Sequence, residues 1–233
     1  MGNRVRKFLI TGYYFEGYHG SMMHICELAE YLKDNNFDVY ITSVHINKLI
    51  KNEIIKNLNV KIYHFDKLPL DVEYDYVLAY HDPILTYLIS KGLKYKYIGT
   101  GCLSYKAKDV ETPSLLTKFN APIFVCSNEL KYILKKEYLI ENIHVIPNFI
   151  PKEFCINNKI SKKLKKIAVV SNHVPKEIIK LKDVLKEKNI NMTFYGRNFL
   201  HKKITPNILK KYDLIITIGK TVQYSLAMGI PVR

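Results

Sequence analysis

The sequence predicts an α/β fold built from two successive units, each with a parallel sheet covered by helices. Short runs of β-branched and aromatic residues alternate with segments in which apolar residues recur at helical spacing. The alternation breaks at the segment 147–151 (PNFIP), and it starts again after a lysine-rich stretch. We therefore expect an N-terminal unit at 1–150, a linker at 151–165 and a partial C-terminal unit at 166–233.

The first unit is expected to contain alternating strands and helices. The apolar residues Ile25, Leu28, Ala29 and Leu32 form one stripe along the first helix. Strands are predicted at Lys7–Gly12, Val39–Ser43, Val60–Phe65, Tyr76–Tyr80, Lys96–Ile98, Ile123–Cys126 and His144–Ile146. Helices are predicted at Ser21–Asp34, Asn47–Leu58, Pro83–Lys91 and Asn128–Tyr138.

The second unit repeats the alternation over a shorter length. Ile178, Leu181 and Leu185 face one way on its first helix, and most of that helix's lysines lie elsewhere. The expected order is strand Ile167–Val170, helix Pro175–Lys188, strand Met192–Tyr195, helix Pro206–Lys211, strand Leu214–Ile218, helix Thr221–Met228 and an edge strand from Ile230.

The composition excludes several classes of protein. The chain has 233 residues, of which 48% are hydrophobic and 24% charged, and this is typical of a globular protein. No apolar run approaches the ~18–20 residues of a membrane span, and the run at Phe8–Ile10 is too short for a secretory signal. The four cysteines include no C-x-x-C pair, so we expect reduced thiols in a cytoplasmic protein.

The positive charge is concentrated in the last third of the chain. The net charge is +15; residues 1–150 carry 18 basic and 16 acidic residues, whereas residues 151–233 carry 18 and 5. Nucleic acid is an unlikely partner because nearly all the basic residues are Lys, and readers of base edges depend on Arg. The run Lys159–Lys166 is either a solvated linker or a peripheral contact with an anionic membrane.

Two strand-to-helix turns are candidate ligand sites. The first runs from Gly12 to Gly20, and Ser21 then caps a helix; the spacing and the absence of an acidic residue after Ser43 disfavour a dinucleotide. In the second turn, a hydrophobic strand leads to Gly219-Lys220-Thr221 at a helix start. Backbone N–H groups, a hydroxyl and an ammonium at one point suit a diphosphate.

Three stretches resemble glycosyltransferases of the GT-B, family 4 type (group 1). The first joins Gly20–Leu32 to Phe37–Thr42, and it is similar to the N-terminal glycine turn, helix and second strand of that family. The second includes Val125–Leu130 and Ile143–Ile150, where IHVIPNFI is similar to the passage that closes the N-terminal domain. The third, Ile218–Val232, is similar to the E-A-L-A-x-G-x-P-V segment of the donor-binding domain.

The sequence also departs from the family pattern. The positions of the E-x7-E pair hold Ile216 and Tyr224, so the carboxylate that would bind the ribose is absent. Gln223 and Tyr224 are the candidate substitutes. The Gly-Arg expected after the first strand of the second domain is also absent, and Arg197, which follows Gly196, and Lys176 are candidate replacement cations.

The resemblance implies two Rossmann-like domains and transfer of a hexose from a nucleotide-diphosphate sugar to a glycan or lipid-linked acceptor in cell-surface polysaccharide synthesis. It implies no metal and no cofactor beyond the nucleotide sugar as co-substrate, and a cytoplasmic protein, peripheral at the inner face of the membrane. The expected catalytic residues are Lys220, Arg197 and His81. The expected donor-binding residues are Gly219, Thr221, Gln223, Tyr224 and Gly196, and the expected acceptor-side residues are Gly20, His19 and Asn148.

Structural alternatives exist for several of these residues. His81 precedes Asp82-Pro83 and can simply start a helix, and Asn148 can fix a turn before Pro151. His24 is a helix-face residue as readily as a ligand contact. The chain ends at Arg233, short of a complete donor domain, so the alternative function is an inactive, truncated GT-B fragment that acts as a binding module.

Overall fold

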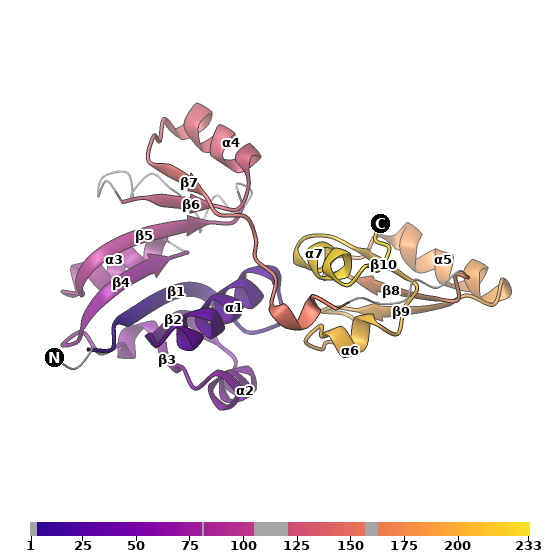
Figure 1. Cartoon of the computed structure of the whole chain (residues 1–233), viewed down its shortest axis with the longest axis horizontal. Coiled ribbons are helices and arrows are strands. Elements are labelled where there is room, and N and C mark those ends of the chain that lie inside the picture. Colours follow the sequence, from indigo (N-terminus) through magenta and orange to yellow (C-terminus); the bar gives the residue numbers. More distant parts are fainter. Residues whose placement is uncertain (1–3, 81, 105–120, 157–162) are drawn as a thin grey trace. The chain divides into compact units, whose positions relative to one another are not determined.

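The computed structural model describes residues 4–80, 82–104, 121–156 and 163–233, and its backbone contacts divide the chain into two units (Figure 1). Unit 1 comprises 1–17 and 21–148, and unit 2 comprises 18–20 and 149–233. Each unit contains a parallel sheet with helices packed on it, as expected from the alternating sequence pattern.

Unit 1 contains a seven-stranded sheet in the order β3-β2-β1-β4-β5-β6-β7, and all of its strand pairs are parallel. The strand order reverses between β1 and β4, which is where open α/β sheets bind ligands. The strands are β1 (Lys7–Phe15), β2 (Asp38–Ile46), β3 (Lys61–His64), β4 (Glu73–Ala79), β5 (Lys94–Cys102), β6 (Ile123–Val125) and β7 (Ile143–Val145).

Several strands run further than the sequence predicts, among them β1 and β5. β1 continues through Phe15 because its aromatic end pairs with β2, with Tyr14 opposite His45. β5 continues to Cys102, through Gly99 and Gly101, beyond the predicted strand Lys96–Ile98. A Cβ at Gly99 would lie 2.8 Å from the Phe124 ring, and one at Gly101 would lie 2.3 Å from the Tyr80 ring. These glycines therefore give space to neighbouring rings within a strand.

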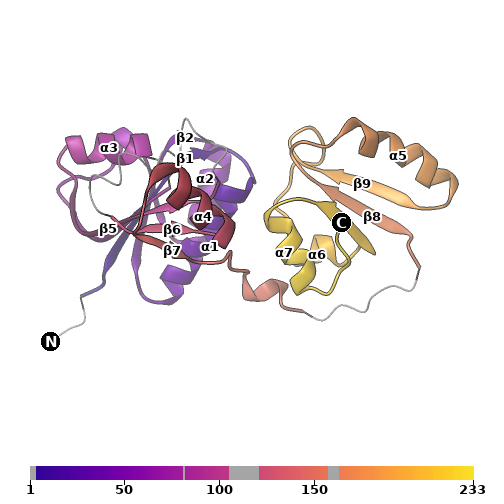
Figure 2. The same ribbon diagram turned by 90° about the horizontal axis from the view of Figure 1, so that it is seen from above.

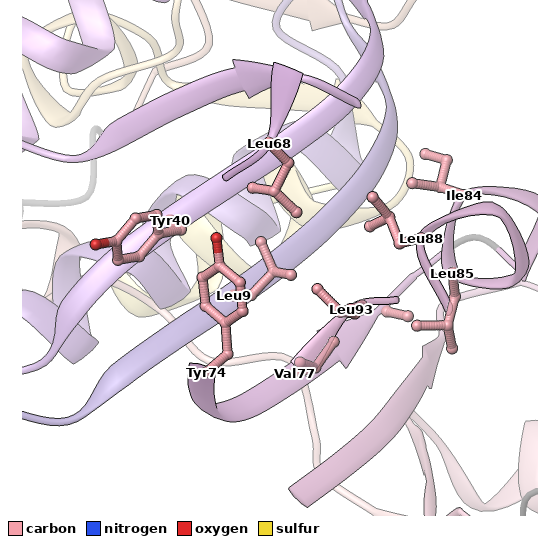
Figure 3. Close-up of a cluster of buried hydrophobic side chains, with 10 residues drawn as sticks. Leu9, Tyr40, Leu68, Tyr74, Val77, Ile84, Leu85, Leu88 and Leu93 are labelled. Carbon is pink, nitrogen blue, oxygen red and sulfur yellow. The ribbon is translucent and has the colours of Figure 1, made fainter. Parts of the chain in front are cut away.

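Four helices in the described part of unit 1 cover its sheet: α1 (Gly20–Asp34), α2 (Lys48–Leu58), α3 (Asp82–Ser90) and α4 (Asn128–Tyr138). Side chains cap two of them, since Asn47 accepts hydrogen bonds from the first turn of α2 and Ser127 accepts one from Leu130. α3 packs on β1 and β4 through a cluster that Figure 3 displays. The labelled members of that cluster are Leu9, Tyr40, Leu68, Tyr74, Val77, Ile84, Leu85, Leu88 and Leu93.

Unit 2 contains a three-stranded parallel sheet in the order β10-β8-β9. Its elements are the short helix η3 (Lys152–Phe154), β8 (Lys166–Val170), α5 (Lys176–Glu187), β9 (Asn191–Tyr195), α6 (Pro206–Leu209), β10 (Leu214–Thr217) and α7 (Lys220–Ala227). In place of the edge strand predicted from Ile230, a single parallel bridge joins Val232 to Ile215. Pro231 has no N–H, so the ladder cannot extend through it.

The helices of unit 2 cover both faces of its sheet (Figure 2). Ile178 and Leu185 of α5 pack on the face that carries Val169 and Phe194. The opposite face packs against α6 and α7 through Leu209, Tyr224 and Met228. Phe154 of η3 also belongs to that second cluster, so this part of the 151–165 segment packs into the core of unit 2.

Candidate functional site

The carboxyl ends of β8, β9 and β10 meet at one edge of the sheet of unit 2, because the three strands are parallel. We call this edge the carboxyl edge. Three segments follow the strands there: Ser171–Asn172 after β8, Gly196–Arg197 after β9 and Ile218–Gly219 after β10. Five of the residues predicted to bind the donor lie in these segments or in α7.

Two of the three segments are in direct contact. Gly196 has φ +144°, and a Cβ added to it would lie 2.0 Å from the carbonyl oxygen of Ser171, so this position requires glycine. The N–H of Arg197 donates to Oδ1 of Asn172 at 3.0 Å. This hydrogen bond holds the backbone of Arg197 in place. Arg197 is an exposed residue. Asn172 is not among the residues predicted from the sequence, although its place directly after a strand could have indicated it.

α7 begins at this edge. Its N-cap is Gly219, with φ +67°, and a Cβ there would meet no atom within 4 Å. Within the described residues, no side chain caps this helix start. The first-turn N–H groups carry the positive end of the helix dipole, so the backbone at Gly219 and Thr221 can accommodate an anion.

Lys220 is held away from solvent. Its side chain is 9% exposed, and Nζ donates to the carbonyl oxygen of Phe149 at 3.1 Å. The ammonium also lies 4.7 Å from the centre of the Phe149 ring and 5.9 Å from that of Tyr224. Lys220 thus connects the start of α7 to the segment that leads into unit 2.

Tyr224 is a core residue. It is 2% exposed, and its ring stacks on Phe154 with the ring centres 4.1 Å apart. Gln223 lies beside it on α7; its Oε1 is buried, with no hydrogen-bond partner among the described atoms. Of the two candidate substitutes for the missing ribose carboxylate, only Gln223 has a side chain outside the aromatic stack. α7 contains no acidic residue.

In unit 1, a buried polar pair lies where the strand order reverses. Tyr80 follows β4, and its hydroxyl lies 2.8 Å from Nε2 of His24 on α1. Burial raises the pKa of Tyr80, so the phenol stays protonated in its hydrogen bond with the imidazole. No local sequence pattern indicates this contact, because 56 residues separate its partners.

The acceptor-side residues come from separate parts of the chain. Gly20 is the first residue of α1, His19 precedes it, and Asn148 ends unit 1. His81 lies outside the described residues. Near the end of β1, Tyr14 stacks on His45 at 5.0 Å, and the hydroxyl of Ser43 donates to the Tyr13 carbonyl oxygen at 2.8 Å.

The described part of the chain contains neither a metal-binding cluster nor a membrane-spanning helix. No group of three or more His, Cys, Asp or Glu side chains is placed there to hold a metal ion. None of the described helices is both long enough and apolar enough to cross a bilayer. The four cysteines form no disulfide.

Comparison with known proteins finds the same fold in solved structures. By sequence, no family model and no curated protein matches the chain. A protein provisionally described as a UDP-N-acetylglucosamine 2-epimerase from Listeria monocytogenes matches with a TM-score of 0.58 and 14% identity, over 98% of this chain and 79% of that one. A structure described as the glycotransferase of kitacinnamycin matches with a TM-score of 0.53 and 10% identity, over 98% of this chain and 80% of that one.

At these identities the likeness establishes the fold alone. The chain has an α/β fold with two Rossmann-like units of the GT-B type, and the fold class predicted from the sequence is confirmed.

Proposed function

We propose that the protein is a glycosyltransferase that moves a sugar from a nucleotide-diphosphate donor to a glycan or lipid-linked acceptor in cell-surface polysaccharide synthesis. The observation that carries this proposal is the carboxyl edge of unit 2. The start of α7 lies at this edge and has no side-chain cap among the described residues. The backbone of Arg197, held by Asn172, lies at the same edge. The solved structures with this fold, one described as a UDP-sugar epimerase and one as a glycotransferase, support the same substrate class.

In this proposal, unit 2 binds the donor. The N–H groups at Gly219 and Thr221 and the hydroxyl of Thr221 bind the diphosphate, and the Arg197 guanidinium stabilises the charge that develops as the diphosphate leaves. Lys220 contributes positive charge at the helix start while it donates to Phe149. Gly196 keeps the loop of Arg197 against Ser171, and Gln223 hydrogen-bonds the ribose. These groups need no metal.

We assign Gly20, His19, Asn148 and His81 to the acceptor side on the resemblance to family 4 enzymes alone. His19 and Gly20 belong to the segment 18–20, which is grouped with unit 2. The protein would work in the cytoplasm, with the basic unit 2 in peripheral contact with the inner face of a membrane, since a lipid-linked acceptor is presented there.

Nucleotide binding tests the donor site directly. We expect UDP or GDP to bind the full chain in calorimetry, and the double variant Arg197→Ala/Thr221→Val to lose at least about tenfold in affinity, since hydrogen bonds to charged groups contribute about 1.5–3 kcal/mol each. The matched control is Lys182→Ala/Thr193→Val, which removes one cation and one hydroxyl from other positions of unit 2. Equal affinity of both variants for the nucleotide would refute the assignment.

A second candidate function is a binding module without turnover. It is favoured by the absence of an acidic residue from α7 and by the position of Tyr224 in the core. A product assay with UDP-, GDP- and CDP-sugars separates the two functions, because a module that binds the nucleotide releases no diphosphate. Transfer that persists in EDTA would agree with a metal-free site.

A further inference from the structure

Lysines from three separate segments meet at the amino ends of the strands of unit 2, opposite the carboxyl edge. Lys163, Lys165 and Lys166 lead into β8, Lys186 and Lys188 precede β9, and Lys210 and Lys211 precede β10; all seven are exposed. We call these residues the basic edge.

Backbone hydrogen bonds join the three segments directly. The N–H of Asn191 donates to the carbonyl oxygen of Lys165 at 2.8 Å, and the N–H of Asp213 donates to that of Lys166 at 2.8 Å. The starts of β9 and β10 are thereby fixed on either side of the start of β8. The lysines consequently form one surface of the folded unit, which cannot be recognised from the single run in the sequence.

Acidic residues do little to neutralise the basic edge. Glu187 and Asp213 are the acids within the same segments. Oδ2 of Asp213 accepts hydrogen bonds from the N–H groups of Lys165 and Lys166 at 2.8 and 2.9 Å, so this carboxylate organises the backbone beneath the lysines. Seven lysines and two acids give these three segments a net charge of +5.

The side chains favour a lipid surface over nucleic acid. The basic edge contains Lys and no Arg, and it has no aromatic ring for base stacking except the half-buried Tyr212, whose hydroxyl lies 2.8 Å from that of Tyr195. Flexible ammonium groups suit the diffuse charge of anionic headgroups. Leu164 lies in the middle of the run Lys163–Lys166 and is 44% exposed, so an apolar side chain accompanies the charges.

We propose that the basic edge docks unit 2 on an anionic lipid bilayer, with Leu164 entering the interface between headgroups and acyl chains. This identifies the surface for the peripheral location in the proposed function. It leaves the carboxyl edge, at the other ends of the same strands, turned away from the lipid.

Vesicle sedimentation of the full chain tests this docking. The protein should bind phosphatidylcholine vesicles that contain about one quarter phosphatidylglycerol, fail to bind phosphatidylcholine alone, and dissociate as salt rises from about 0.1 M to about 0.5 M. Each lysine contributes roughly a fivefold factor at such a surface, so Lys163→Gln/Lys165→Gln/Lys166→Gln should lower the partition coefficient about 100-fold. Leu164→Gln should lower it severalfold and leave the salt dependence unchanged.

The matched control is Lys180→Gln/Lys202→Gln/Lys203→Gln, which removes the same charge from exposed positions outside the basic edge and should retain most of the binding. Equal losses in the two triple variants, both folded by circular dichroism, would overturn the proposal. So would tighter binding of a DNA duplex than of the anionic vesicles at the same salt. The assay contains no nucleotide, so its failure leaves the proposed enzymatic function standing, and a failed transfer assay leaves the docking standing.

Discussion

The contact between Gly196 and Ser171 allows a quantitative prediction about the carboxyl edge. In Gly196→Ala the new Cβ would lie 2.0 Å from the Ser171 carbonyl oxygen, so the two segments must separate by about 1 Å to reach a tolerable contact. A backbone at φ +144° costs a residue other than glycine roughly 1–3 kcal/mol. Separation also weakens the hydrogen bond from Arg197 to Asn172, worth about 1 kcal/mol. With about 1 kcal/mol more for the steric separation itself, we expect a total loss of about 3–5 kcal/mol.

Thermal unfolding followed by circular dichroism measures this loss. For a unit of this size, about 1 kcal/mol corresponds to roughly 4–8 °C, so Gly196→Ala should lower the Tm of unit 2 by more than about 10 °C. The control is Gly229→Ala. Gly229 also has a positive φ, of +67°, but a Cβ added there would meet no atom within 4 Å, so this variant should cost about 1–2 kcal/mol. If the two variants lose the same stability, the close approach of Gly196 to Ser171 is wrong.

Three further predictions concern residues that stabilise the two units. The backbone N–H of Lys7 and the ammonium of Lys96 lower the pKa of Asp75. The stability that the ionised Asp75 gives the folded state is therefore present above the ordinary carboxyl pKa of about 4 and is lost as the pH falls below it. Asp75→Asn should flatten the acid limb of a Tm-against-pH curve. Burial, and to a lesser extent the hydrogen bond with the Tyr212 hydroxyl, raises the pKa of Tyr195 to about 12. Unit 2 should therefore lose stability as the pH rises from about 10 to 12. Tyr212→Phe should lower the pKa of Tyr195 in an ultraviolet titration. Phe154→Ala removes a fully buried ring and should cost about 3–5 kcal/mol in urea unfolding.

Local composition was sufficient to predict most of the fold. β-branched and aromatic runs located the strands because they pack well on a pleated surface, and the stripe through Ile25 and Leu32 located α1. The failures have a common physical cause. Gly99 and Gly101 belong to β5 because rings from Phe124 and Tyr80 occupy the space of their missing side chains. Contacts of this kind depend on residues distant in sequence, which no local pattern contains.

The candidate site was predictable at the level of backbone position only. The sequence placed Gly219 and Lys220 at a helix start, and the structure has them there. The local sequence contains no information on the direction of the Lys220 side chain, because that direction depends on Phe149, 71 residues earlier in the chain. Tyr224 is a candidate for ribose binding because of its hydroxyl. Its ring stacks on Phe154 of η3, and no local pattern around Tyr224 predicts this partner.

Lys220 and Arg197 differ in how they could stabilise a leaving diphosphate in the proposed reaction. The Lys220 ammonium is bound to the Phe149 carbonyl oxygen and covered by aromatic rings, so direct contact with a phosphate would require it to give up that hydrogen bond. Its charge can act without such a movement, because in a poorly solvated position the field of a fixed cation is weakly screened. Arg197 has the complementary arrangement, since its backbone is fixed by Asn172 while its side chain is exposed. In the proposed reaction, contact with the departing group would therefore fall to Arg197, and Lys220 would contribute a preorganised field at the start of α7.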